Sequence, residues 1–128
     1  MSAGHRSRAE NTTATAPSMR ITTTRTGRGS HVVRLAGEVD HDQSRVLESA
    51  LDRAVADRPA RLVVDMSALT FCDSTLVNAL LKIRVSARAA GVELVLAAPP
   101  PQARRLLEIT GVDEIFTLRG SVRAATGG

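Results

Sequence analysis

The sequence has very little cysteine, aromatic residue or lysine, and each shortage excludes a class of protein. Cys72 is its only cysteine, so no intramolecular disulfide can form, and three scattered histidines beside one cysteine match no zinc-binding spacing. The aromatic residues are two phenylalanines, too few for the stacking platforms that bind single-stranded nucleic acid. We therefore expect a protein without a disulfide, a structural metal or a cofactor.

Long apolar runs are also missing. No window approaches the roughly 18 consecutive apolar residues that span a bilayer, so we expect a soluble cytoplasmic protein without a membrane segment. Residues 2–18 contain no leucine, isoleucine, valine or phenylalanine, which excludes the apolar core of a signal peptide and an amphipathic transit helix. We interpret residues 1–18 as a disordered basic tail.

The net charge of +4 is unevenly placed along the 128 residues. Residues 1–30 hold five arginines and one glutamate, whereas the rest of the chain holds twelve basic and twelve acidic side chains. The length suits one domain, since domains contain about 100 to 200 residues. We place the domain at residues 19–118, followed by a flexible polar tail at 119–128.

The hydrophobic pattern predicts alternating strands and helices. Residues 19–25 and 31–36 are β-branched runs around a glycine-containing turn, which favours an N-terminal β-hairpin. This order of elements predicts an α/β fold: a mixed four- to five-stranded sheet with parallel inner strands, covered by three to four helices. The remaining predicted elements are a helix at 41–57, in which Asp40 is the N-cap and Gln43 its capping-box partner, a strand at 61–66, a helix at 76–90, a strand at 92–97, a short helix at 106–109 and an edge strand at 115–118.

Asp73, Ser74 and Thr75 form a cluster of small oxygen-bearing side chains just before the predicted helix at 76–90. A helix N-terminus has unpaired amides and a partial positive charge, so the fold would tolerate a phosphate on Ser74. Such a phosphate would act on a partner and make the cluster a switch. The competing interpretation is that Ser74 or Asp73 merely caps the helix, because both residue types are preferred N-caps.

The order and spacing of five segments resemble the STAS domain of the anti-sigma factor antagonist (anti-anti-sigma factor) family. These segments are LAGEVD at 35–40, LVVDMS at 62–67, FCDST at 71–75, GVELVL at 91–96 and RLLEITGV at 105–112. The resemblance covers about residues 19–118 and implies a STAS-like sheet. It also implies that the unphosphorylated protein binds an anti-sigma factor and frees a sigma factor for transcription.

By the same resemblance, Ser74 matches the family's regulatory serine, which the anti-sigma factor phosphorylates because it is also a serine kinase. Thr75 is a second candidate, and a serine phosphatase would reset the switch. The implied partner-binding edge consists of Glu38, Asp40, Asp73, Ser74, Thr75 and Leu76. For two of these a structural interpretation stays open, in which Asp40 caps its helix and Glu38 is solvated in the loop after the hairpin.

Leu76 departs from the family pattern, which usually has glycine at this position. A leucine there could narrow access to Ser74 or change the choice of partner. This departure favours an alternative function: a non-phosphorylated STAS scaffold, or the soluble subunit of a transport complex, in which Ser74 only caps its helix. A third hypothesis is nucleic-acid binding by the arginine-rich tail, although we expect no direct contact with nucleic acid from the domain.

The sequence lacks the catalytic set of an enzyme. Ser74 lies between Cys72 and Leu76 rather than in the Gly-x-Ser-x-Gly elbow of a hydrolase. Cys72 is expected to be buried, and the carboxylate that follows it would raise its pKa. The only lysine lies in a predicted helix rather than in a phosphate-binding loop, and Asp65 has no acidic cluster to hold magnesium for aspartyl phosphorylation. We therefore predict a binding protein.

Overall fold

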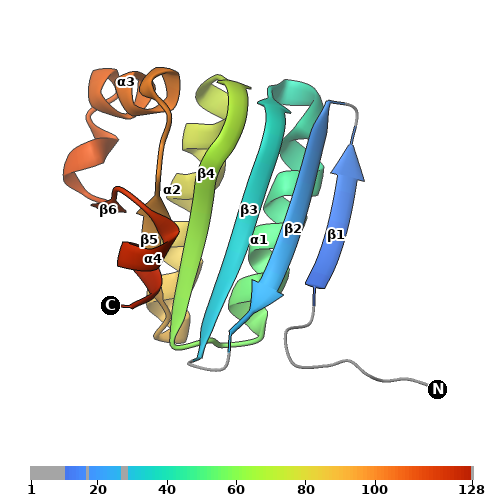
Figure 1. Ribbon diagram of the computed structural model, residues 1–128, viewed down its shortest axis with the longest axis vertical. Coiled ribbons are helices and arrows are strands. Elements are labelled where there is room, and N and C mark those ends of the chain that lie inside the picture. Colours follow the sequence, from blue (N-terminus) through green and yellow to red (C-terminus); the bar gives the residue numbers. More distant parts are fainter. Residues whose placement is uncertain (1–10, 17, 27–28, 128) are drawn as a thin grey trace.

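The computed structural model describes residues 11–16, 18–26 and 29–127, which form one sheet with helices on both faces (Figure 1). The sheet has six strands, arranged in sequence order. The first two strand pairs are antiparallel and the other three are parallel. The strands are β1 (Asn11–Ala16), β2 (Met19–Arg25), β3 (Ser30–Val39), β4 (Arg61–Cys72), β5 (Glu93–Ala97) and β6 (Thr117–Arg119).

Helices connect the parallel strands. α1 (Ser44–Ala56) and α2 (Ser74–Ala90) cover one face of the sheet, and α4 (Val122–Thr126) lies on the other face beside β5 (Figure 1). α3 (Pro101–Ile109) lies at the end of the sheet where β4 ends, and two 3-10 turns, η2 (His41–Gln43) and η3 (Val112–Glu114), precede α1 and follow α3. None of the helices within the described ranges is long and apolar enough to cross a bilayer.

The main core lies between the sheet and the layer formed by α1 and α2. Alternate residues of a strand point to the same face of the sheet, and residues three or four apart lie on the same face of a helix. The apolar residues follow these spacings, so their side chains lie between the sheet and the two helices. Full burial of each large aliphatic side chain stabilises the fold by about 1.5–3 kcal/mol. The largest buried side chains include Ile21, Leu35, Leu47, Leu51, Leu62, Met66, Leu76, Leu80, Ile83, Leu96 and Leu107.

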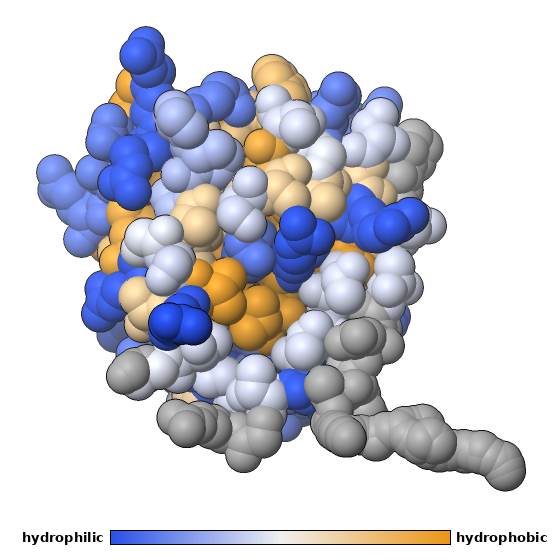
Figure 2. All heavy atoms as spheres, in the orientation of Figure 1, coloured by the Kyte–Doolittle hydropathy of each residue, from blue (hydrophilic) through white to orange (hydrophobic). Residues whose placement is uncertain are grey.

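The opposite face of the sheet carries a smaller apolar cluster under α4. Val63 and Val95 pack there against Ala125, and Figure 2 shows apolar side chains in the middle of this face, bordered by polar ones. Arg61 fixes α4 in place, because its guanidinium donates to the Ala125 carbonyl oxygen at 2.7 Å and to Glu93 at 2.9 Å. Both faces of β4 are thus covered, which explains why Leu62, Val63 and Val64 are apolar without alternation.

The predicted hairpin, the parallel inner strands and the order of the later elements are confirmed, and the sheet has one strand more than expected. The additional strand, β1, lies within the segment expected to be a disordered tail, so that expectation is wrong for 11–16; residues 1–10 lie outside the described part of the chain. All six β1 residues pair with β2, and the threonines suit a strand although no large apolar residue marks it.

Two further segments differ from the prediction. Residues 67–72 extend β4 and pair with β3 rather than forming a loop. Residues 122–126 form α4 rather than a flexible tail, because the apolar side chains of Val122 and Ala125 are covered by the sheet. Both segments are ordered by tertiary contacts that the local sequence pattern does not reveal.

Candidate functional site

The ends of β3 and β4 bring two acidic turns together at one edge of the sheet, at the top of Figure 1. In the parallel register Val39 lies opposite Cys72, the last residue of each strand. The Asp73 N–H donates to the Val39 carbonyl oxygen at 3.2 Å, which joins the two strand ends. Asp40 and Asp73 therefore occupy equivalent positions, one residue beyond neighbouring strands.

Ser74 is the first residue of α2, and it is exposed. The preceding residue, Asp73, has an extended backbone and is the N-cap, because its Oδ1 accepts the Thr75 N–H at 2.8 Å. Thr75 is half-buried, so Ser74 is the more exposed of the two neighbouring hydroxyl-bearing residues. Of the two predicted caps, the structure selects Asp73 and leaves the Ser74 hydroxyl outside the cap.

Asp40 performs the same task before η2. Its Oδ1 accepts the Asp42 N–H at 2.9 Å, and Gln43 Oε1 accepts the Asp40 N–H at 2.7 Å. The predicted capping box is thus confirmed, and it shapes the short 3-10 turn that leads into α1. This contact fixes Asp40 at the edge, half-buried and close to the start of the helix.

Glu38 is exposed, as expected, but it lies within β3 rather than in a loop. The loop expectation is wrong because β3 continues to Val39 alongside the extended β4. Glu38 lies opposite Phe71, whose large apolar side chain is 43% exposed. Phe71 was not among the predicted site residues, although an aromatic residue in so aromatic-poor a chain was a usable signal.

Gly37 determines how β3 passes the turn between β1 and β2. Its φ is 98°, and a Cβ atom at this position would collide with the backbone oxygen of Ser18. The same oxygen accepts the Glu38 N–H at 2.7 Å. Glycine is therefore required at position 37 for close approach of the two backbones, and this approach fixes Glu38 at the sheet edge.

Leu76 does not belong to the exposed edge. Its side chain is fully buried in the main core, together with Leu80 and Ile83 of the same helix. The expectation that Leu76 contributes to a partner-binding surface is therefore wrong. A side chain directed into the core also does not cover Ser74, which remains exposed beside it.

Gln102 of α3 holds the end of β4, a contact that no local sequence pattern indicates. Its Oε1 accepts the Cys72 N–H at 3.0 Å, and its Nε2 donates to the Cys72 carbonyl oxygen at 2.8 Å. β5 pairs with β4 only as far as Asp65, where Ala97 lies opposite. Beyond that point the Gln102 amide takes the place of a strand neighbour at Cys72 and fixes the backbone just before Asp73.

The Cys72 thiol is protonated at neutral pH, as expected from the sequence. Burial raises the pKa of Cys72 to about 11, and the neighbouring Asp73 carboxylate adds to the rise. Only a thiolate is an effective nucleophile, so the protonated Cys72 thiol is unreactive. Its side chain instead packs in the main core.

Asp65, the residue weighed above for aspartyl phosphorylation, is buried, and two nearby residues contact its carboxylate. Its Oδ1 accepts the Ser67 N–H at 3.0 Å, and its Oδ2 lies 3.8 Å from Arg34 Nε. Within the described residues, no group of three or more histidine, cysteine, aspartate or glutamate side chains is placed to hold a metal ion. The edge around Ser74 is thus a surface suited to binding, with exposed Glu38 and Phe71 and two fixed acidic caps.

Comparison with known proteins identifies the fold. Residues 21–125 match the STAS domain family. The anti-sigma-F factor antagonist RsfB of Mycobacterium tuberculosis is 30% identical over 100 residues, which cover 78% of this chain and 81% of RsfB. The anti-sigma F factor antagonist of Paenibacillus polymyxa is 29% identical over 92 residues, which cover 71% of this chain and 79% of that protein.

Among solved structures, an anti-sigma factor antagonist from Mycobacterium paratuberculosis has the same architecture. It matches with a TM-score of 0.78 at 30% identity, over 88% of this chain and 95% of the other. The mixed sheet, antiparallel at its N-terminal side and parallel thereafter, is thus a STAS-type fold. The chain belongs to the STAS domain family, which confirms the resemblance drawn from the five sequence segments.

Proposed function

We propose that the protein is an anti-sigma factor antagonist of the partner-switching type. Unphosphorylated, it binds an anti-sigma factor through the edge where β3 and β4 end, and this binding frees a sigma factor for transcription. The anti-sigma factor also acts as a serine kinase, and phosphorylation of Ser74 releases the antagonist. A serine phosphatase restores the binding form, and the whole cycle takes place in the cytoplasm.

The exposed position of Ser74 at the first residue of α2 is the observation that carries this proposal. Asp73 already caps the helix, so the Ser74 hydroxyl is not needed for that role. The names of the relatives that are about 30% identical over most of the chain support the same function. Thr75 is the second candidate acceptor, although it is less exposed.

A phosphate on Ser74 would change the edge far more than the fold. It adds about −1.5 to −2 charge at neutral pH, in the favourable field of a helix N-terminus. The Thr75 N–H is already bonded to Asp73, so the phosphate would remain directed outward. Together with exposed Glu38 and the two acidic caps, it would make the edge strongly negative, and a partner that fits the uncharged serine would lose affinity.

In this proposal the protein is a substrate of the kinase and not itself an enzyme. The γ-phosphoryl group of ATP is transferred to Ser74 Oγ, the hydroxyl proton passes to a base of the kinase, and ADP leaves. The nucleotide and its magnesium ion belong to the kinase, which is the anti-sigma factor. The antagonist contributes an accessible hydroxyl on a rigid helix start and the surface that the kinase recognises.

The test is phosphorylation by the serine-kinase anti-sigma factor encoded nearest to this gene, followed by mass-spectrometric mapping. The wild-type protein is expected to gain one phosphate on Ser74. Ser74→Ala is expected to abolish the modification, whereas the matched control Thr75→Val leaves it in place. Modification at residues other than Ser74, or none with any cognate kinase, would contradict the proposal.

The alternative is a STAS scaffold or a soluble subunit of a transport complex, in which Ser74 is never phosphorylated. The sequence feature that favoured it was Leu76, and burial of that side chain leaves Ser74 exposed. Affinity capture with the purified protein separates the two functions. A kinase-type anti-sigma factor among the captured proteins supports the switch, and a transporter subunit captured equally by wild type and Ser74→Ala supports the scaffold.

A further inference from the structure

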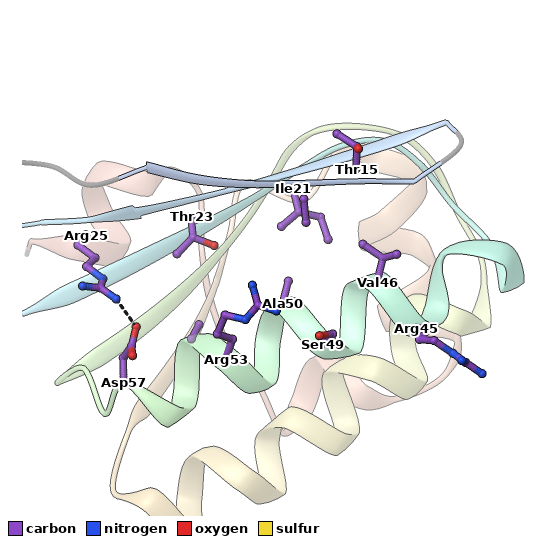
Figure 3. A pocket seen from close by; sticks show the side chains of 12 residues that line it. Thr15, Ile21, Thr23, Arg25, Arg45, Val46, Ser49, Ala50, Arg53 and Asp57 are labelled. Atoms are coloured by element: carbon purple, nitrogen blue, oxygen red, sulfur yellow. Dashed lines mark hydrogen bonds and ion pairs between the residues drawn. The ribbon is translucent and has the colours of Figure 1, made fainter. Parts of the chain in front are cut away.

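A groove of about 550 Å³ runs between α1 and the β1–β2 side of the sheet, and none of its lining residues belongs to the edge that carries Ser74. Its apolar floor is formed by Ile21 of β2 and by Val46, Ala50 and Ala54 of α1. Figure 3 shows Ile21 directed from the sheet toward the helix and Val46 directed back toward the sheet. Small-molecule sites typically have volumes of about 300–1,000 Å³ and mainly apolar walls, so this groove has the size and lining of one.

The groove has charged side chains at both ends: Arg45 lies near the start of α1, and Arg25, Arg53 and Asp57 lie toward its C-terminus. Arg25 donates to Asp57 at 2.6 Å there, so these two charges largely satisfy one another. Arg53 projects from α1 into the same groove (Figure 3). Among the described residues, Arg53 has no ion pair or side-chain hydrogen bond. The hydroxyls of Thr23 and Ser49 line the groove as well.

We propose that this groove binds a small anionic amphiphile, a free carboxylate with an aliphatic body. The aliphatic part would lie on the floor formed by Ile21, Val46, Ala50 and Ala54, where it replaces water on apolar surface. The carboxylate would accept hydrogen bonds from the Arg53 guanidinium, whose planar donor pair matches its two oxygens. This binding function goes beyond partner switching and does not depend on Ser74.

A ligand with one negative charge leaves the Arg25–Asp57 pair intact and neutralises Arg53, which projects into the groove and has no partner among the described residues. The ligand expected in the groove therefore has one anionic group and one apolar body.

Titration of the full chain with dodecanoate, below the concentration at which it forms micelles, tests the proposal by calorimetry and amide NMR shifts. We expect saturable binding of one dodecanoate, with shifts in α1 and β2. Arg53→Gln should weaken binding at least tenfold. The matched control Arg88→Gln should change it less than twofold, since Arg88 is an exposed arginine of α2 that does not line the groove.

Two further comparisons define the chemistry. Dodecanol, which lacks the charge, should bind wild type and Arg53→Gln with equal and weaker affinity than dodecanoate binds wild type. Ala50→Phe should fill the floor and abolish binding of both ligands. Absence of saturable binding, equal loss in Arg88→Gln, shifts confined to the sheet face under α4, or Arg53-dependent binding to anionic phospholipid vesicles but not to dodecanoate would each overturn the proposal.

Discussion

The side-chain amide of Gln102 pairs with the backbone of Cys72 through two hydrogen bonds, one accepted at 3.0 Å and one donated at 2.8 Å. The two residues are 30 positions apart, and their contact closes the end of β4 where β5 no longer accompanies it. The residues that follow Cys72 are Asp73 and Ser74, so the contact fixes the backbone from which α2 and its exposed serine begin.

Replacing Gln102 by leucine should therefore destabilise the protein. It leaves the Cys72 N–H and carbonyl without partners, and each net hydrogen bond contributes about 0.5–1.5 kcal/mol, so we expect a loss of about 1–3 kcal/mol. Urea unfolding measures this loss. Arg105→Leu, at an exposed position of the same helix, is the control and should change the unfolding free energy by less than about 0.5 kcal/mol. Equal effects of the two substitutions would show that the Gln102 contact does not stabilise β4.

Alanine substitutions at Gly37 and Gly91 distinguish the cost of backbone strain from the cost of a steric collision. Both have positive φ, but a Cβ atom would collide with Ser18 at position 37 and meet open space at position 91. We expect Gly91→Ala to cost about 1 kcal/mol for its conformation alone, and Gly37→Ala to cost at least about 3 kcal/mol. Thermal unfolding of both variants tests this difference. Similar costs at the two positions would mean that the close approach of β3 to Ser18 is not required.

His31 should make stability depend on pH. Burial and the nearby Arg25 charge lower the pKa of His31, while Asp57, whose Oδ2 lies 4.0 Å from His31 Nδ1, partly opposes them. Because its folded-state pKa lies below the unfolded value near 6.5, the unfolded chain binds more protons in that interval. Stability is therefore full above about pH 6.5 and falls as the pH decreases toward the folded-state pKa.

The variant His31→Asn should remove this part of the pH dependence, and the exposed His41→Asn should retain it. Unfolding free energies measured by urea titration between pH 5 and pH 8 provide the comparison. If wild type and His31→Asn show the same slope below pH 6.5, burial of His31 does not control acid stability.

Cys72 should be unreactive in the folded protein. Its thiol is buried and its pKa is raised to about 11, so almost no thiolate is present at pH 8. A chromogenic disulfide reagent should modify the native protein at least a hundredfold more slowly than the urea-unfolded chain. Rapid stoichiometric reaction of the native protein would contradict the burial of Cys72.

Much of the fold could be predicted from the sequence, because strands β2 to β5 and helices α1 and α2 have strong apolar periodicity. β1 could not, since its threonines and alanines form a strand only once β2 offers an edge. The site was predictable where the contacts are local: Asp40, Gln43 and Asp73 all bond within three residues.

Contacts between distant residues could not be predicted. No local pattern connects Gln102 with Cys72. Leu76 was assigned to the partner-binding edge because it belongs to the motif around Ser74, but its side chain is buried. The helical spacing of Leu76, Leu80 and Ile83 already placed Leu76 on the buried side of α2, and this was the stronger signal. Proximity in sequence to a functional residue is thus a weak guide to which side of a helix a neighbour faces.

In the proposed mechanism, a phosphate on Ser74 controls binding of the anti-sigma factor. The most direct measurement is calorimetric titration of that partner with the unphosphorylated protein and with the same protein carrying phosphoserine at position 74. The partner-switching mechanism predicts at least a tenfold higher Kd for the phosphorylated form, equivalent to a coupling of about 1.4 kcal/mol or more, with the fold unchanged by circular dichroism. Equal affinities of the two forms for the anti-sigma factor would contradict it.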